Sequence, residues 1–323
     1  MKTQYKITPW WLTGFTQADG SFLVTHESRP AGKLPFYPQP VFSLTQTVRD
    51  LAMMQAIHAF LGVGQLSVSK GCVTLTVRNL QDILNVIIPH FDKYPLRGGK
   101  YLAFIRFKIV CILKSSKLHL ELPVYLQIVQ LTCINPVLYD KIMKATVDKF
   151  GTLPSFTPID LNDWITPPIP AVDMNIDYVT GLIDGDGSIN FAFPAGQRRV
   201  SPNVTVIASL DDLSVLEDLI LFFGCGKINK LPSKAVVFKV ITLSEILGKV
   251  WPLITLGQFN TVKQTYIDKS YQAMLILQSR GVRNDADLLT IVDLVYDMNQ
   301  GGKNRRLTKA AYCEKFSLSV NKT

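Results

Sequence analysis

The sequence predicts an α+β fold made of two pseudo-symmetric domains, each with the element order αββαββα. Three observations lead to this prediction: an internal repeat, matching hydrophobic periodicity in both halves, and a length of 323 residues. That length corresponds to about two domains of ordinary size. We expect an N-terminal domain over 1–150, a linker over 151–171 and a C-terminal domain over 172–323.

The repeat is clearest in two short segments. Residues 12–22 read LTGFTQADGSF, and residues 179–189 read VTGLIDGDGSI. The correspondence continues, because 61–66 resembles 223–228 and 82–89 resembles 245–252. A repeat of this length is a duplicated domain and not a solenoid unit.

The proposed linker is rich in proline. It contains Pro154, Pro158, Pro167, Pro168 and Pro170, and proline favours extended, semi-rigid chain. A long ordered loop within one domain is the alternative, and the duplication on either side favours the linker.

The elements of the first half follow from local signals. Thr8 and Pro9 are good N-cap and first-turn residues, so a short helix begins there and ends at Gly20. The segment 28–40 has too many prolines and glycines for a strand. Periodicity then predicts strands 21–27 and 41–47, helix 50–61, a hairpin of 65–69 and 73–78 turning at Lys70-Gly71, helix 80–88, and further helices to about 150.

The second half repeats this order. We expect a helix ending at Gly187, strands 188–193 and 203–207, helix 213–222, a hairpin within 227–241 and helix 244–250.

The repeated motif has the spacing of a helix contact. Gly14 and Ala18 are four residues apart, as are Gly181 and Gly185, so each pair shares a helix face on which another backbone can approach closely. Leu12 and Phe15, like Val179 and Leu182, then point into a core. The glycine that follows each motif suits a left-handed residue after the helix.

Each motif ends in an acid, Asp19 or Asp186, at the negative end of a helix dipole. A lone Asp-Gly is usually a turn, but two at matching positions of a duplication predict a shared function. Divalent cations with oxygen ligands would compensate the charge. Two aspartates holding Mg²⁺ beside a basic, strand-rich surface indicate metal-assisted phosphodiester hydrolysis.

Composition excludes several other classes. The net charge of +9 and pI of about 9.2 favour a polyanionic partner, and 47% hydrophobic residues exclude a disordered chain. The five cysteines form no C-x-x-C pair, so a zinc site or disulfide framework is not expected. No apolar run reaches the roughly 18 residues of a membrane span, and we expect no membrane partner. The N-terminus has no presequence pattern, which predicts either synthesis where the protein works or an address that the sequence does not reveal.

The two motifs resemble the paired signature of LAGLIDADG homing endonucleases in their single-chain form, and residues 90–96 resemble the intron-encoded members of fungal mitochondria. The resemblance spans about residues 8–310. It implies two four-stranded antiparallel saddles along the DNA major groove and cleavage of both strands of a long asymmetric target. It also implies a monomer, two or three Mg²⁺ ions that Mn²⁺ or Ca²⁺ can replace in binding, and a mitochondrial location, with the chloroplast as the alternative.

The resemblance also assigns roles to individual residues. Asp19 and Asp186 would be metal ligands, with the backbone carbonyls of Ala18 and Gly185. Gln46 would order solvent, a contact that Ala208 or Ser209 of the second half cannot repeat. Lys100 and Lys263 are candidate catalytic lysines, and Lys227 is a rival in the second half. The sixth motif position, Gln17 or Asp184, would make packing and polar contacts between the helices.

Alternation along the strands predicts a polar face that reads about 20 base pairs of double-stranded DNA. The expected DNA-binding residues of the first half are Leu23, Thr25, Glu27, Arg29, Ser43, Thr45, Gln65, Ser67, Ser69, Thr74, Thr76 and Arg78. Those of the second half are Asn190, Asn203, Thr205, Lys227, Asn229 and Lys239. Two alternatives stay open: an intron maturase that binds host intron RNA on the same scaffold, and a basic DNA-binding module without catalysis.

Overall fold

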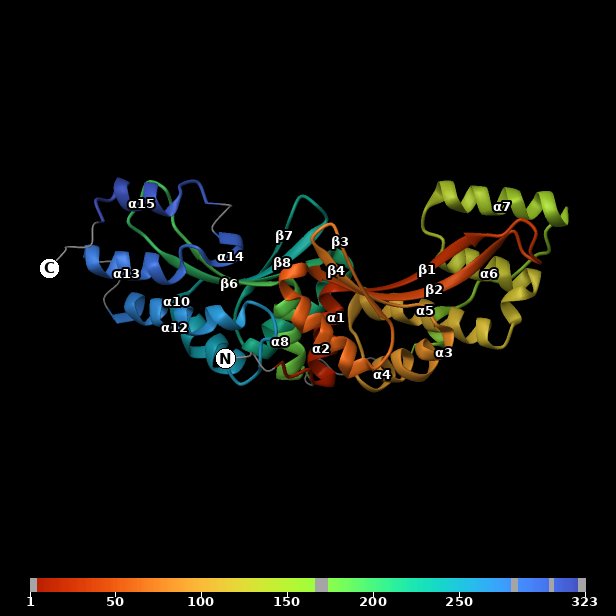
Figure 1. Ribbon diagram of the computed structural model, residues 1–323, viewed down its shortest axis with the longest axis horizontal. Coiled ribbons are helices and arrows are strands. Elements are labelled where there is room, and N and C mark those ends of the chain that lie inside the picture. Colours follow the sequence, from red (N-terminus) through yellow and green to blue (C-terminus); the bar gives the residue numbers. More distant parts are fainter. Residues whose placement is uncertain (1–4, 166–173, 280–283, 302–304, 319–323) are drawn as a thin grey trace. The chain divides into compact units, whose positions relative to one another are not determined.

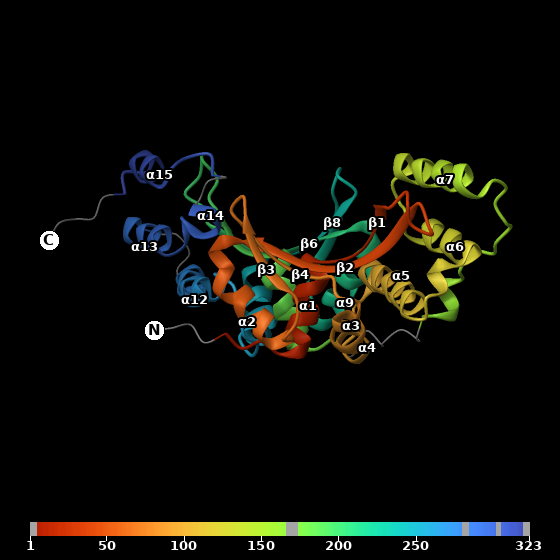
Figure 2. The same cartoon turned by 45° about the vertical axis from the view of Figure 1, so that its right-hand side comes forward.

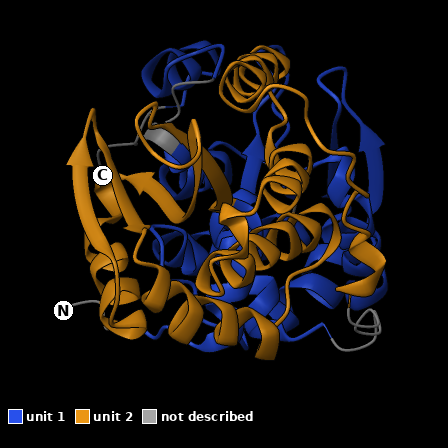
Figure 3. Cartoon of the chain, turned by 90° about the vertical axis from the view of Figure 1, so that its right-hand side faces the viewer, with its two compact units in different colours: residues 1–18, 171–323 blue, residues 19–170 orange. Residues whose placement is uncertain are grey.

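A computed structural model describes residues 5–165, 174–279, 284–301 and 305–318. The chain forms two compact units, coloured separately in Figure 3. Unit 1 comprises residues 1–18 and 171–323, and unit 2 comprises residues 19–170. The first motif helix therefore groups with the second half of the chain. The boundaries drawn from the repeat stay a prediction, and residues 166–171 of the proposed linker lie outside the described residues.

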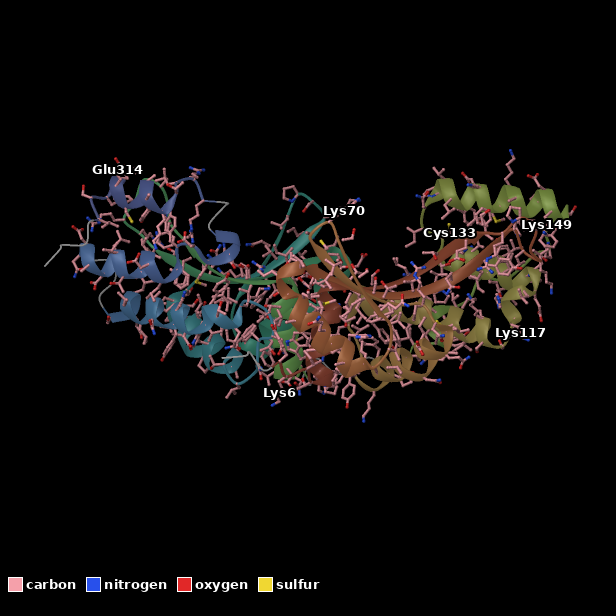
Figure 4. All side chains as sticks on the ribbon, viewed as in Figure 1. Lys6, Lys70, Lys117, Cys133, Lys149 and Glu314 are labelled. Carbon is pink, nitrogen blue, oxygen red and sulfur yellow. The ribbon has the colours of Figure 1, made fainter. Side chains whose placement is uncertain are left out.

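Unit 2 contains a four-stranded antiparallel sheet with the order β1-β2-β4-β3. The strands are β1 (Gly20–Ser28), β2 (Phe36–Thr47), β3 (Gln65–Ser69) and β4 (Cys72–Val77). The predicted hairpin turn is confirmed, because Lys70 and Gly71 both have positive φ, as a type I′ turn requires. Figure 4 labels Lys70 at the tip of this hairpin.

The sequence predicted no strand within residues 28–40, because this segment is rich in proline and glycine. That prediction was wrong for residues 36–40. β2 begins at Phe36 and includes Pro38 and Pro40. In this stretch β2 pairs only with β1, because its pairing with β4 begins at Phe42. The edge without a partner strand needs no backbone donor, so a proline is tolerated there.

Helices cover one face of the unit 2 sheet, as Figures 1 and 2 show for α2 and α5. Phe22 and Phe42 of the sheet pack against Phe91, Phe104 and Phe107 from the helical layer. We call the opposite face of each sheet its outer face. The helices are α2 (Leu51–Leu61), α3 (Leu80–Asp82), α4 (Ile88–Lys93), α5 (Gly98–Ser115), α6 (Leu122–Thr132) and α7 (Pro136–Phe150).

Unit 2 also contains a small hydrophobic core around α6. Tyr125 and Val129 of α6 pack with Phe36 of β2, and Leu153 and Phe156 from the proposed linker pack against the same cluster. The first part of the linker is therefore attached to unit 2.

Unit 1 repeats the sheet with the order β5-β6-β8-β7. The strands are β5 (Gly187–Ala192), β6 (Ser201–Ser209), β7 (Lys227–Lys230) and β8 (Ala235–Val240). The helices are α1 (Pro9–Asp19, of which Asp19 is counted in unit 2), α8 (Ile176–Asp186), α9 (Leu213–Phe223), α10 (Leu243–Glu245), α11 (Trp251–Ile254), α12 (Gln264–Ser279), α13 (Asp285–Val295), α14 (Met298–Gly301) and α15 (Lys309–Lys315). The predicted order αββαββα is thus confirmed in both halves. Even a π-helical turn recurs, at Ile83–Ile87 and Ile246–Val250.

The two motif helices, α1 and α8, pack through their glycines as the spacing predicts. A Cβ at Gly14 would lie 1.9 Å from the carbonyl oxygen of Tyr178, and one at Gly181 would lie 2.1 Å from that of Trp11. Neither position can accept a side chain without moving a backbone.

The prediction of a left-handed glycine after each motif helix was wrong. Gly187 is extended, with φ −85° and ψ 158°, and Gly20 is not among the residues with positive φ. At Gly187 the requirement is space, because a Cβ there would lie 2.6 Å from Cα of Ile183. The chain passes directly from helix into strand at this close contact.

Candidate active site and nucleic-acid interface

Asp19 is the last residue of α1 and is half-buried. The Nε2 of Gln46, on β2, donates to its Oδ2 at 2.5 Å. Sequence reasoning grouped these two residues, and the structure brings them together. In unit 1 the equivalent residue is Ala208, whose side chain cannot donate, and the Ser209 hydroxyl donates to Asp212.

Lys100 lies in the first turn of α5 and reaches the end of the motif. Its Nζ donates to the carbonyl oxygen of Gly20 at 2.6 Å. An ammonium group at this place opposes the negative end of the α1 dipole. The lysine therefore partly compensates the negative charge that the sequence predicts at the end of this motif.

Lys263, the equivalent of Lys100, also reaches its motif end in unit 1, but it contacts other carbonyls. Its Nζ donates to the carbonyl oxygens of Ile183, Asp184 and Gly185, at 2.8, 2.6 and 3.2 Å. The Ile183 carbonyl also accepts from the backbone N of Gly187, whereas those of Asp184 and Gly185 belong to the last turn, where a helix has no donor of its own to offer. The lysine therefore stabilises the end of α8. Asp186 is the next residue after Gly185, and it is exposed.

Asp184 is a buried carboxylate surrounded by donors. Only 2% of it is exposed. Its Oδ2 accepts from the indole Nε1 of Trp11 at 3.0 Å and from the backbone N of Asn260 at 2.6 Å. Its Oδ1 accepts from the hydroxyl and the backbone N of Thr261. Burial raises the pKa of this carboxyl to about 6, although these donors and Lys263 lower it.

The Asp184 contacts fix the position of Lys263. Trp11 belongs to α1, so the predicted polar contact between motif helices is present. Asn260 and Thr261 lead directly into Lys263, so the same carboxylate holds that segment against α8. Gln17, the equivalent of Asp184, instead donates from its Nε2 to Asp212 at 3.2 Å. Sequence reasoning missed the partners at 260 and 261, because nothing in the motif indicates a contact so distant in the chain.

The oxygen atoms at each motif end fit a hard divalent cation in type. Each end offers an aspartate carboxylate beside backbone carbonyls, the donors that Mg²⁺ and Ca²⁺ prefer. The Gly185 carbonyl is also the most distant of the three that Lys263 contacts. Within the described ranges, no group of three or more His, Cys, Asp or Glu side chains comes together. What each end offers is therefore an aspartate carboxylate with main-chain oxygens, and no larger cluster of such side chains among the described residues.

The residues expected to read DNA in the first half lie on or beside the outer face of the unit 2 sheet. The register places Ser43 opposite Thr76 and Thr45 opposite Thr74, and Gln65 and Ser67 lie beside those threonines on β3. Thr45 and Thr74 share a hydroxyl hydrogen bond of 3.0 Å. None of the twelve expected residues is buried: Leu23, Thr25, Glu27, Arg29, Ser43, Thr45, Gln65, Ser67, Ser69, Thr74, Thr76 and Arg78. At the strand end, Arg29 pairs with Glu27 at 3.0 Å.

The unit 1 sheet presents a different chemistry. Asn190 is opposite Asn203, and Thr205 is opposite Lys239, which also faces Lys227. Asn229 faces Val237. Lys227 therefore belongs to the outer face, where it corresponds to Gln65, and Lys263 is the residue at the end of the motif helix.

The family model described as LAGLIDADG endonuclease matches residues 12–111 and 179–274. The chain belongs to this family. It is 40% identical over 274 residues to the probable intron-encoded DNA endonuclease 1 of Mycosarcoma maydis, covering 82% of this chain and 99% of that protein. It is 23% identical to the probable intron-encoded endonuclease 2 of Neurospora crassa, over 93% of this chain and 68% of that protein.

Solved structures share the fold. The homing endonuclease I-GzeII, in complex with its DNA target, matches with a TM-score of 0.75 and 25% identity, over 93% of this chain and all of that one. I-SmaMI bound to cleaved DNA matches with a TM-score of 0.76 and 24% identity, over 92% and 98% of the two chains. None of the described helices is long and apolar enough to cross a membrane.

Proposed function

We propose that the chain is a homing endonuclease that cuts both strands of a long, asymmetric DNA target. The observation that carries the proposal is the repeated arrangement at the motif ends. Asp19 and Asp186 each close a motif helix, and Lys100 and Lys263, equivalent in the repeat, each donate to main-chain carbonyls within three residues of the motif acid. The names of the relatives and the DNA in the related structures agree with it.

The cofactor in this proposal is Mg²⁺, held by Asp19 and Asp186 with the carbonyls of Ala18 and Gly185. When bound, Mg²⁺ lowers the pKa of water and neutralises charge on the scissile phosphate. A related structure contains Ca²⁺ with an uncleaved target, which supports a divalent ion of either kind in binding. Gln46 orients solvent beside Asp19, and this contact is present in one half only.

Lys100 and Lys263 are the catalytic lysines in this proposal. Their ammonium groups donate to main-chain carbonyls at the motif ends, and in this proposal they offset the charge that develops on the phosphate oxygens. Lys227 lies on a strand of the outer face and takes the role of a groove contact. The contacts at the helix ends favour the first pair over their rival.

The substrate surface in this proposal is the outer face of both sheets. Polar side chains there read base edges, while lysines and arginines at the rim contact phosphates. One chain carries both motifs, so a monomer is sufficient for a target of about 20 base pairs. The intron-encoded relatives, which include a protein in an ND4 intron of Podospora anserina, support an organellar and mitochondrial origin.

The test uses a plasmid that carries the intronless form of the host gene. We expect one double-strand cut with Mg²⁺ and none with EDTA. Asp19→Asn and Asp186→Asn should each lower the cutting rate by about 10³-fold, because each removes a metal ligand. Asp163→Asn changes an exposed aspartate in a 3₁₀ turn of unit 2 and is the matched control.

Binding separates loss of catalysis from loss of structure. The two motif variants should still shift the target DNA in the presence of Ca²⁺. Stimulation of intron splicing without any cutting would overturn the proposal in favour of a maturase. Binding without cutting by the unchanged protein would favour a module without catalysis.

A further inference from the structure

The outer faces of the two sheets can be compared residue by residue. One row crosses each sheet beside the motif serine and runs through all four strands. In unit 2 it is Ser21, Ser43, Thr76 and Gln65, and in unit 1 it is Ser188, Thr205, Lys239 and Lys227. The same register positions therefore carry hydroxyl and amide groups in one unit and two ammonium groups in the other.

The next row differs more sharply. In unit 2 it contains Thr45 and Thr74, whose hydroxyls hydrogen-bond at 3.0 Å. In unit 1 the corresponding pair is Ile207 and Val237. Ile207 is 47% exposed although β6 is a central strand. An apolar, β-branched pair thus replaces a polar pair in the middle of the outer face.

The surroundings of this pair determine what can cover it. Lys239 lies in the row beside Ile207, and Asn229 lies next to Val237 on β7. α9 packs against the other face of β6 and β8, so it leaves this side open. A ligand here must be apolar at one spot and anionic or rich in acceptors around it. In the major groove, the 5-methyl of thymine is the apolar group, and guanine offers acceptors to lysine.

We propose that Ile207 and Val237 form a contact surface for one thymine methyl group in the half of the target that unit 1 binds. This inference rests on the proposed function. Lys227 and Lys239 then face a guanine about two base pairs away, because two strand residues and two base steps both span about 7 Å. The threonines of unit 2 present a hydroxyl beside each methyl group, so the preference for thymine at this distance from the centre should be weaker in the other half of the target.

The test removes only the methyl group. The target is first selected from a randomised duplex library with the full-length protein in Ca²⁺. Each thymine of the selected site is then replaced in turn by deoxyuridine, and binding is measured by fluorescence anisotropy. One position in the unit 1 half should lose affinity by about fourfold, the value of one buried methyl group.

The variant Ile207→Thr/Val237→Thr installs the side chains that unit 2 already uses at these positions. Because threonine keeps one methyl group, the variant should reduce the difference between the thymine and deoxyuridine targets without abolishing it. The reciprocal variant Thr45→Ile/Thr74→Val should strengthen the preference for thymine at the equivalent position of the other half. Leu221→Thr removes an exposed leucine from α9 and is the matched control. It should keep the wild-type difference between the two targets.

The outcomes separate the two proposals. If the wild-type protein enriches no sequence, the endonuclease proposal fails. If it enriches a target but no deoxyuridine substitution weakens binding, or if the weakening is undiminished in Ile207→Thr/Val237→Thr, the methyl contact is overturned and the endonuclease proposal stands.

Discussion

At the scale of single residues, the Asp184 carboxylate links three segments of unit 1 by hydrogen bonds. Its carboxylate accepts from α1 through Trp11 and from the segment before Lys263 through Asn260 and Thr261. Burial raises its pKa from 3.8 to about 6, so the folded chain holds this proton more tightly than the unfolded chain. The stability that the group contributes is therefore fully present below pH 3.8 and is lost as the pH rises through about 6.

Thr261→Val should make this loss larger. The Thr261 hydroxyl lowers the pKa of Asp184 by donating to it, so the variant carboxyl should titrate above 6. The variant should lose about 1–3 kcal/mol of unfolding free energy at pH of about 8, where Asp184 is charged, and little at pH of about 4. Urea denaturation at the two pH values measures the difference.

Thr265→Val is the control for this prediction, because that hydroxyl donates to the backbone carbonyl of Val262 and to no titratable group. Its effect should be the same at both pH values. An equal loss for Thr261→Val at both would show that the hydroxyl does not act through the charged carboxylate.

At the scale of elements, the motif helices depend on direct backbone contact. Gly14→Ala or Gly181→Ala would place a methyl group about 2 Å from a carbonyl oxygen of the other helix. The helices would have to separate, so the unfolding free energy should fall by at least about 2 kcal/mol. Chemical denaturation measures this fall. Gly248→Ala is the control, since its Cβ would meet nothing within 4 Å, and it should stabilise by up to about 1 kcal/mol.

Much of this architecture could be predicted because it is local and repeated. The spacing of Gly14 and Gly181 predicts the helix contact, and Lys70-Gly71 predicts the hairpin turn. Pro38 and Pro40 led to a wrong prediction, since whether a strand edge has a partner depends on the whole sheet. For the glycine at position 187, the reason inferred from the sequence was wrong. A side chain there would collide with Ile183, so the position requires space and not a left-handed backbone.

The arrangement at the motif ends was partly predictable. The repeat pairs Asp19 with Asp186 and Lys100 with Lys263, and the structure brings each lysine to its motif end. The catalytic roles of these residues stay a prediction. The partners of Asp184 at 260 and 261 could not be found, because long-range hydrogen bonds leave no pattern in one sequence. Ile207 was missed because an isoleucine in a strand is ordinarily assigned to the core, although the alternation that places Asn203 and Thr205 outward also places Ile207 there.

At the scale of the whole chain, the duplication has kept the motif ends alike and made the outer faces different. The ends need the same chemistry on both DNA strands, whereas base recognition needs none of that symmetry. Thr76 corresponds to Lys239, Gln65 to Lys227 and Thr45 to Ile207. The net charge of +9 adds affinity for any DNA sequence, so specificity must come from these differences.

Symmetrical targets should therefore be poor ligands. A palindrome made from two copies of either half of the selected target mismatches one unit at several base pairs, each costing about 1–3 kcal/mol. Affinity should fall by more than about tenfold relative to the asymmetric target. Competition binding at one fixed salt concentration measures the ratio, because the charge-driven contribution changes with salt. The control for base composition is a target in which the two halves of the selected site exchange places. It contains the same base pairs as the selected target, but the sequence at its centre is different. If a palindrome bound as tightly as the selected target, one unit would be contributing no base recognition, and the differences between the outer faces would have no part in target choice.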